Sequence, residues 1–158
     1  MSDRYFEDFK VGDRFTSAGM TMTEAGIIDF ARQWDPQSFH VDAEFAKKWT
    51  YGGLIASGLH TMAVTLRLWL DQGVMRACSL GSPGLGEVQF QRPVRPGDTL
   101  RVMTDIVELR LSTTKTDRGI ARIRQVTINQ RGEQVMEQET TVFLKRRPVQ
   151  AASVGARS

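Results

Sequence analysis

The order of sequence patterns predicts an α+β domain in which one long central helix is wrapped by a curved antiparallel β-sheet. Helical periodicity is confined to the first half of the chain, and β-rich runs separated by turn residues follow Leu80. The longest apolar stretch, Leu54 to Leu70, lies between these halves. At 158 residues the chain suits one domain with a sizeable core. We expect that domain over residues 1–147, and a disordered tail over residues 148–158, which are small and polar.

The composition is that of an ordinary globular protein, with 41% apolar and 25% charged residues. Lys and Arg exceed Asp and Glu by 21 to 18, and because this surplus is not clustered, nucleic acid is not an expected partner. Cys78 is the single cysteine, and nothing near Met1 resembles a cleavable signal segment. Polar residues interrupt the Leu54–Leu70 stretch, which is too short to span a membrane. We therefore expect a cytoplasmic protein without a membrane partner.

Three helical segments are expected in the first half. Thr23 is the expected N-cap of a helix over residues 24–34, where apolar residues recur at helical spacing. Pro36 should end this helix, because proline disfavours the α conformation at the preceding residue. Asp42 is expected to cap the short helix "AEFAKKW". A helix from Ile55 to Asp71 has a wide apolar face, which indicates protein on most of its sides.

Four β-rich runs follow the long helix. They read "GEVQFQRPV" from residue 86, "DTLRVMTDIVELRL" from 98, "IARIRQVTINQ" from 120 and "EQVMEQETTVFLK" from 133. The connections "RPGD", "TKTDRG" and "RGE" consist of residues that favour turns. Short connections between successive strands predict an antiparallel meander.

The stretch "WDPQSFHVD", residues 34–42, contains the candidate catalytic side chains. It places Asp35 five residues before His40, one of only two histidines. A carboxylate can accept a proton from water while a neutral imidazole holds the same water through a hydrogen bond. Positions five apart diverge on a regular helix. We therefore expect an irregular overhang after the first helix, in which Pro36 lets the two side chains converge.

Each of these residues also has a structural interpretation. Asp35 could simply cap the end of its helix, and His40 could be a hydrogen-bonded histidine without a chemical role. Ser57 fits a helix N-cap better than a nucleophile, because no Gly-x-Ser-x-Gly turn surrounds it. His60 fits a packing role best, while contact with the substrate and a hydrogen bond across an interface stay open as alternatives. No metal site is expected, because a set built on His40 and Asp42 would need a second histidine and only His60 remains.

Together these motifs resemble the MaoC-type branch of the hotdog fold, whose members include R-specific enoyl-CoA hydratases. The resemblance extends from about Tyr5 to Arg147. It rests on the spacing of Asp35, Pro36, His40 and Asp42, on "IASG" at 55–58, and on "FQRPVRPGDTL" at 90–100. It implies a hotdog domain that reversibly adds water to a 2-enoyl-CoA thioester, with no cofactor beyond the CoA of the substrate. It also implies a homodimer or a higher homo-oligomer, which would protect the exposed edge of the sheet.

The resemblance assigns Asp35 and His40 to the water, and the backbone N–H of Gly58 to the thioester oxygen. An N–H at a helix start has no partner within the helix and lies at the positive end of its dipole. Glycine lets a carbonyl approach closely because it has no Cβ. Residues expected to contact the acyl group are Ser57, Trp34, Phe39 and Leu54, and candidates for the CoA phosphates are Arg92, Arg95 and Lys115.

Two positions depart from the family pattern. Gln37 stands where asparagine is usual, and Leu66 stands where some hydratases have a serine. We therefore expect fewer polar groups to support Asp35 than in those hydratases. Two other functions stay open: an acyl-CoA thioesterase on the same fold, and a non-catalytic acyl-CoA binder that is the partner subunit of a two-component dehydratase.

Overall fold

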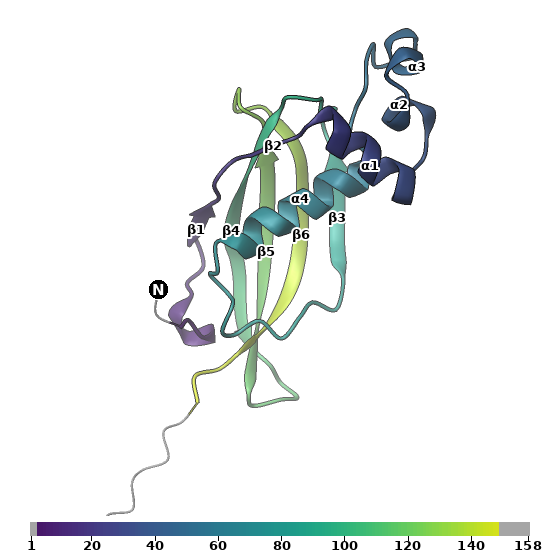
Figure 1. The fold of residues 1–158 in the computed structure, drawn as a ribbon. Coiled ribbons are helices and arrows are strands. Elements are labelled where there is room, and N and C mark those ends of the chain that lie inside the picture. Colours follow the sequence, from purple (N-terminus) through teal and green to yellow (C-terminus); the bar gives the residue numbers. More distant parts are fainter. Residues whose placement is uncertain (1–2, 149–158) are drawn as a thin grey trace, which may run out of the picture.

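A computed structural model describes residues 3–148. In it the helix α4 (Gly58–Asp71) lies across one face of a curved antiparallel sheet (Figure 1). The expected α+β class is confirmed. The expected tail lies, apart from its first residue, outside the described residues.

The sheet is antiparallel throughout, with the strand order β1-β4-β5-β6-β3 and with β2 paired to β4. Its long strands are β4 (Thr99–Leu111), β5 (Arg118–Ile128) and β6 (Gln134–Lys145), which form the expected meander. Within residues 3–148, the strand β3 (Leu85–Phe90) pairs only with β6 and forms one edge. The strands β1 (Arg14–Thr16) and β2 (Met20–Thr21) were not expected from the sequence.

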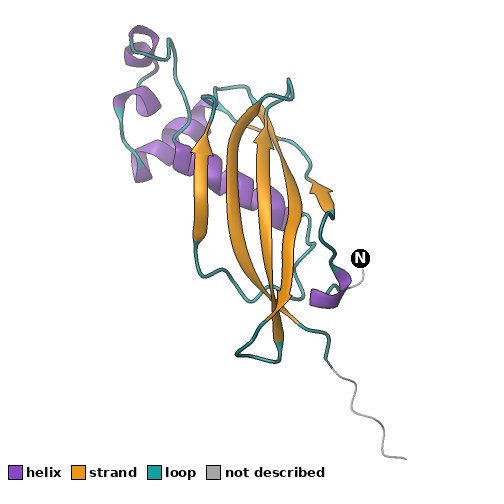
Figure 2. Cartoon of the chain, turned by 180° about the vertical axis from the view of Figure 1, so that it is seen from behind, coloured by secondary structure: helices purple, strands orange, loops and turns teal. Residues whose placement is uncertain are grey.

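The sheet has one face toward α4 and one face toward solvent. On the inner face, residues from β4, β5 and β6 pack with α4 into one hydrophobic core that includes Leu68, Leu100, Ile123 and Leu144. On the outer face, which no helix covers in Figure 2, charged side chains pair across strands, as Arg124 does with Glu137. One buried and one solvated face explain the period-two pattern of the strands.

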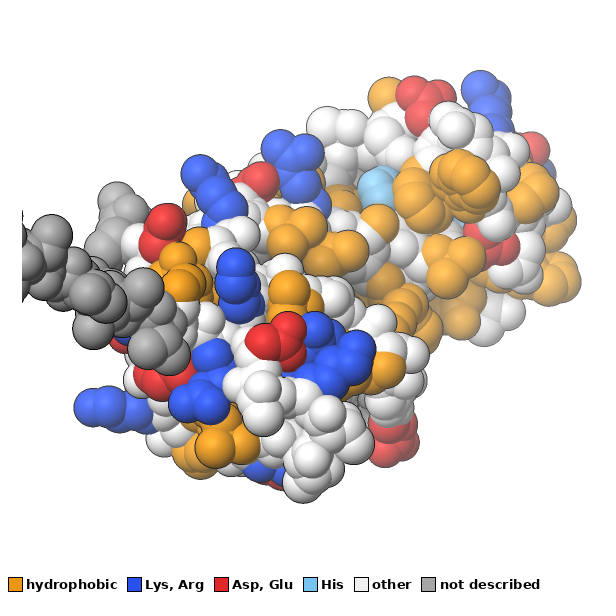
Figure 3. Space-filling view, turned by 90° about the horizontal axis from the view of Figure 1, so that it is seen from below, with side chains coloured by type: hydrophobic (Ala, Val, Ile, Leu, Met, Phe, Trp, Pro, Cys, Tyr) orange, Lys and Arg blue, Asp and Glu red, His pale blue; other side chains and the backbone are white. Residues whose placement is uncertain are grey.

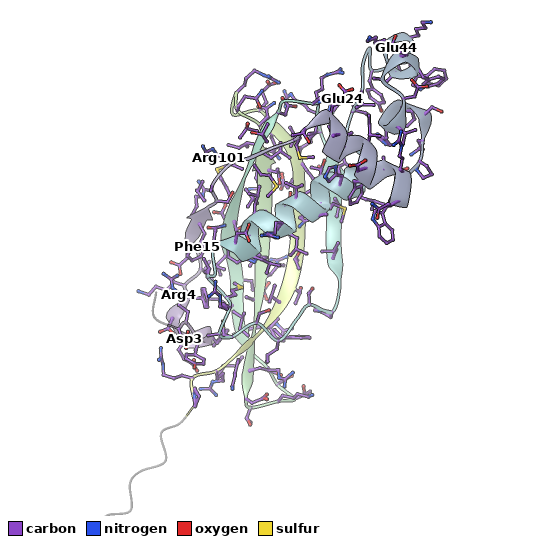
Figure 4. All side chains as sticks on the ribbon, viewed as in Figure 1. Asp3, Arg4, Phe15, Glu24, Glu44 and Arg101 are labelled. Atoms are coloured by element: carbon purple, nitrogen blue, oxygen red, sulfur yellow. The ribbon has the colours of Figure 1, made fainter. Side chains whose placement is uncertain are left out.

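Three shorter helices gather beside the start of α4: α1 (Glu24–Trp34), α2 (Ser38–Val41) and α3 (Ala43–Lys48) (Figure 1). The side chain of Thr23 caps α1 and that of Asp42 caps α3, as expected. The 3₁₀ turn η1 (Phe6–Asp8) lies at the other end of the molecule. Figure 4 shows this separation, with Glu24 and Glu44 at the helical end and Asp3 and Arg4 at the opposite end.

The surface differs between the two ends. Seen from below in Figure 3, hydrophobic side chains gather toward the distant end, whereas Lys, Arg, Asp and Glu are interspersed on the near end. Exposed hydrophobic side chains on the helices include Trp34, Trp49, Leu59, Leu66 and Leu70. Within residues 3–148, no helix is both long enough and apolar enough to cross a membrane.

Candidate active site

Asp35 is placed by the end of α1. Pro36 follows it, and Asp35 leaves the helical conformation (φ −156°, ψ 69°) while its N–H still bonds to the carbonyl of Ala31. Its carboxylate turns toward the start of α4 and accepts two hydrogen bonds. Ser57 Oγ donates to Oδ2 at 2.6 Å, and Gln37 Nε2 donates to Oδ1 at 2.8 Å. Gln37, which stands where asparagine is usual, thus supplies part of the polar support of Asp35.

His40 lies in the short helix α2, where the sequence had suggested an irregular loop. Its side chain is buried, and Nδ1 lies 2.7 Å from the carbonyl oxygen of Ile55. A carbonyl oxygen only accepts hydrogen bonds, so Nδ1 must carry a proton. Nε2, on the other side of the ring, lies 3.4 Å from Asp35 Oδ2.

The tautomer of His40 decides what this pair can do. With the proton on Nδ1, a neutral ring presents a lone pair at Nε2 and faces a carboxylate oxygen, which is also an acceptor. Two acceptors this close repel each other unless a proton lies between them. A water molecule that donates one hydrogen to Nε2 and one to Oδ2 satisfies both. The arrangement is therefore suited to holding a water and removing a proton from it.

Asp35 is ionised at neutral pH. Its partial burial raises the pKa of the carboxyl group, but the hydrogen bonds from Ser57 and Gln37, together with the attraction of His40 when that ring is protonated, outweigh burial and hold that pKa below its ordinary value. A base must be unprotonated before it can act, so the two hydrogen bonds keep the carboxylate in its reactive form.

The start of α4 supplies a second polar feature. Ser57 caps the helix through a bond from the N–H of Leu59 to Ser57 Oγ, at 3.2 Å. Within residues 3–148, the N–H of Gly58 has no hydrogen-bond acceptor. The ring of Phe90, at the end of β3, covers Gly58 so closely that a Cβ there would lie 2.6 Å from it. The Gly58 N–H is free to bind an oxygen, and any side chain at this position would have to displace the Phe90 ring.

One cavity of about 370 Å³ brings these groups together. Four of the expected residues line it: Asp35, Phe39, His40 and Gly58. The other three do not. Ser57 is fully buried beneath Asp35, Leu54 belongs to the hydrophobic core, and Trp34 is 66% exposed to solvent. Phe90 lines the cavity but was not singled out from the sequence, since no local pattern places β3 against the start of α4.

The basic residues expected at the CoA phosphates and the second histidine lie in different parts of the structure. Arg92 lines the cavity and pairs with Glu133 at 3.3 Å, whereas Arg95 donates to the carbonyl of Tyr51 at 2.6 Å. Lys115 lies in the turn between β4 and β5 and does not line this cavity. His60 stacks on Phe30 with 4.5 Å between ring centroids, which agrees with the packing role expected for it.

Comparison with known proteins identifies the family. The sequence profile of the "MaoC like domain" matches residues 9–130, most of the chain. The chain belongs to the MaoC-like family. Protein YdeM of Bacillus subtilis is 30% identical over 140 residues, which cover 89% of this chain and 98% of YdeM. A crystal structure described as the MaoC-like dehydratase from Rhodospirillum rubrum is 39% identical. It has a TM-score of 0.86 and covers 92% of this chain and 99% of its own.

More distant solved structures share the fold. The (R)-hydratase from A. caviae involved in PHA biosynthesis is 22% identical, with a TM-score of 0.69, and covers 90% of this chain and 99% of its own. A Mycobacterium tuberculosis protein described as having a double hotdog fold is 20% identical, with a TM-score of 0.79, over 96% of this chain and 47% of its own. The chain is thus one hotdog domain of the MaoC-like family.

Proposed function

We propose that this MaoC-like protein is a hydro-lyase that reversibly adds water to the double bond of a 2-enoyl-CoA thioester with R specificity. The observation that carries the proposal is the meeting of three groups in one cavity: the Asp35 carboxylate, the Nε2 of His40 and the N–H of Gly58. The family supports it, since the similar protein from Rhodospirillum rubrum is described as a dehydratase.

In the hydration direction, Asp35 and His40 hold one water through its two hydrogens. The oxygen of this water attacks the β-carbon of the enoyl group, and the electrons of the double bond move onto the thioester oxygen. One water proton passes to the Asp35–His40 pair and from there to the α-carbon, while the other stays on the new hydroxyl group. Dehydration is the reverse, and no proton or electron is left over.

The negative charge on the thioester oxygen needs a fixed donor. The N–H of Gly58 lies at the first position of a 14-residue helix, so the helix dipole adds to its hydrogen bond. A single donor of this kind contributes roughly 3 to 4 kcal/mol to the stability of the transition state. The ring of Phe90 lies directly over the same glycine.

The deciding experiment uses crotonyl-CoA. Hydration removes the absorbance of the conjugated double bond and leaves the thioester intact, whereas hydrolysis releases a free thiol. We expect loss of absorbance without thiol release, and a fall in kcat/KM of at least about 100-fold in Asp35→Asn. Asp29→Asn, the same change on the exposed face of α1, should keep full activity. Cys78 will not disturb the thiol assay, because burial raises the pKa of its thiol to about 11.

Each contrary result has a definite meaning. Thiol release that depends on Asp35 would identify a thioesterase, in which the carboxylate directs water at the carbonyl carbon. Full hydration by Asp35→Asn would end the proposed mechanism. Binding of enoyl-CoA thioesters without turnover of any of them would identify a non-catalytic acyl-CoA-binding subunit.

The proposal includes a homodimer. The strand β3 has a free edge, and the exposed apolar side chains Leu85 and Phe90 lie on it. Leu66 and Leu70 of α4, also exposed, share a cavity wall with Leu85. Two copies of an antiparallel edge strand can pair about a twofold axis, which satisfies both edges and closes the assembly.

A further inference from the structure

A second and larger cavity, of about 640 Å³, follows the first along α4. Its helical wall is apolar, and it continues over Leu85 of β3. Its floor is the inner face of β5 and β6, where Gln125, Gln138 and Thr140 stand among apolar residues. An apolar chamber with buried amides in its floor is unusual, because burying a polar group is unfavourable unless it is hydrogen-bonded.

The two cavities follow one another along α4 and β6, without a shared lining residue. The first is lined by Gly58 and Thr61 of α4, and the second begins at Met62, the next residue of the same helix. The same order holds on β6, where Val135 lines the first cavity and Gln138 the second. With a rise of about 1.5 Å per residue, the second cavity begins about 6 Å along α4 from the Gly58 position. A thioester held at Gly58 would reach the second cavity by extending its acyl group along α4.

The amides belong to a polar row that crosses the sheet. Thr104, Gln125 and Gln138 are direct cross-strand neighbours on β4, β5 and β6. Gln138 Nε2 donates to Gln125 Oε1 at 2.8 Å, and Gln125 Nε2 donates to Thr104 Oγ1 at 3.3 Å. The next position in the row is Val88 on β3, which cannot continue the chain of hydrogen bonds.

The row of hydrogen bonds therefore ends at Gln138. This side chain is 4% exposed, and its Oε1 has no hydrogen-bond partner within residues 3–148. Rotating both amides by 180° would reverse the bonds and leave Nε2 of Gln138 unpaired instead. In either orientation, one polar end of a buried amide on the cavity wall has no partner.

An unpaired buried amide costs about 1 to 3 kcal/mol. Leucine or methionine at this position would suit a plain hydrocarbon chain better, although it would leave one end of the buried Gln125 amide unpaired instead. Local rules are broken most often where function requires it. A ligand with its own hydrogen-bonding group would satisfy the open end from the cavity side.

We infer that Gln138 determines substrate specificity, and that the preferred acyl group carries an uncharged hydrogen-bonding substituent, such as a hydroxyl, where its chain passes Gln138. This inference rests on the proposed hydration at the first cavity. A hydroxyl both donates and accepts, so it fits either orientation of the amide. Met62 and Trp69 of α4 contact the remaining hydrocarbon, and the second copy of the proposed dimer covers Leu66 and Leu70 from outside.

The test compares pairs of 2-enoyl-CoA thioesters of equal chain length, one plain and one with a terminal hydroxyl, over a series of lengths. We expect the wild-type protein to prefer the hydroxylated member at one or two lengths, by at least about tenfold in kcat/KM. Gln138→Met, of similar volume but without the amide, should bring that ratio close to one. Gln134→Met, the same change on the same strand outside the cavity, should leave the ratio unchanged.

Dissociation constants for the same pairs, measured by calorimetry with Asp35→Asn, separate this inference from the proposed function. If the plain thioesters are hydrated but no length shows a preference for the hydroxyl, the inference fails and the hydratase stands. If no thioester is hydrated, the proposed function fails, and the binding ratio alone decides the role of Gln138. If Gln138→Met does not fold, the wild-type series decides, because equal values throughout it would overturn the inference.

Discussion

Nε2 of His40 lies 3.4 Å from Oδ2 of Asp35, although Asp35 ends α1 and His40 belongs to α2. Neither helix alone could bring the two atoms together. The carbonyl of Ile55 fixes the proton on the far side of the imidazole, and Ser57 fixes the carboxylate. Both anchors come from the segment that leads into α4, so the same segment orients the water-binding pair and presents the N–H of Gly58.

Ser57→Ala tests how Asp35 is kept ionised. The hydrogen bond from Ser57 helps to hold the pKa of Asp35 below its ordinary value, so its loss should raise that pKa. Activity that needs the carboxylate is present above this pKa and is lost as the pH falls through it. The acidic limb of the kcat/KM profile should therefore move to higher pH in Ser57→Ala. Loss of the N-cap should also lower the free energy of unfolding by about 1 kcal/mol.

Thr23→Ala is the matched control for Ser57→Ala. Thr23 caps α1 as Ser57 caps α4, but the described hydrogen bonds do not connect it to Asp35. We expect a similar loss of stability and an unchanged pH profile. An acidic limb that moves equally in both variants would show that instability, rather than the lost hydrogen bond, causes the shift.

Gly58→Ala tests the close approach of Phe90. Alanine would ordinarily stabilise a helix relative to glycine, but here its Cβ would lie 2.6 Å from the Phe90 ring. The clash involves only the far end of the Phe90 ring, which is 54% exposed and can move toward solvent. We therefore expect Gly58→Ala to lower the free energy of unfolding by no more than about 1 kcal/mol, and to lower kcat/KM because the displaced ring disturbs the approach to the Gly58 N–H. Urea denaturation and crotonyl-CoA kinetics measure the two effects.

The double variant Gly58→Ala/Phe90→Ala identifies the cause. Removing the ring removes the clash, so the glycine substitution should cost little stability when Phe90 is already alanine. If the two losses simply add, the clash with Phe90 does not explain the sensitivity of Gly58.

The fold could be predicted from local patterns wherever an element carries its own boundaries. Thr23 and Asp42 mark helix starts through their side chains, and the period-two pattern of β6 marks a strand with one buried face. The strands β1 and β2 are three and two residues long. They exist because they pair with β4, far along the chain, and such pairing leaves no local signal.

Some features of the candidate site could likewise be predicted from local sequence, and others depend on how distant segments pack. The spacing of Asp35 and His40 is a local motif, and the sequence suffices to select both residues. The hydrogen bond from Ser57 to Asp35 joins residues 22 positions apart and depends on how α1 packs on α4, so no spacing rule contains it. Gln37 could have been recognised, because an amide two residues after an aspartate is within reach of its carboxylate.

His60 should make the stability of the protein depend on pH. Burial lowers the pKa of this histidine below its ordinary value of 6.5. Below pH 6.5 the unfolded chain binds a proton at His60 more readily than the folded chain does. The contribution of neutral His60 to the free energy of unfolding is therefore complete above pH 6.5, and it is lost as the pH falls from 6.5 through the lower pKa of the folded state. His60→Phe keeps the stack on Phe30 but cannot be protonated. Urea denaturation at about pH 8 and about pH 5 should show a smaller decline in the variant than in the wild type.

Leu70→Lys tests the proposed dimer. Leu70 is exposed on α4 beside the free edge of β3, where a second copy would bury it, and a buried unpaired charge there would oppose association. Sedimentation equilibrium should find dimers of the wild type and monomers of Leu70→Lys. Leu111→Lys is the matched control, because Leu111 is equally exposed but ends β4 on the opposite side of the sheet order from β3. It should remain dimeric, and a dimer that survives Leu70→Lys would place the interface on another surface.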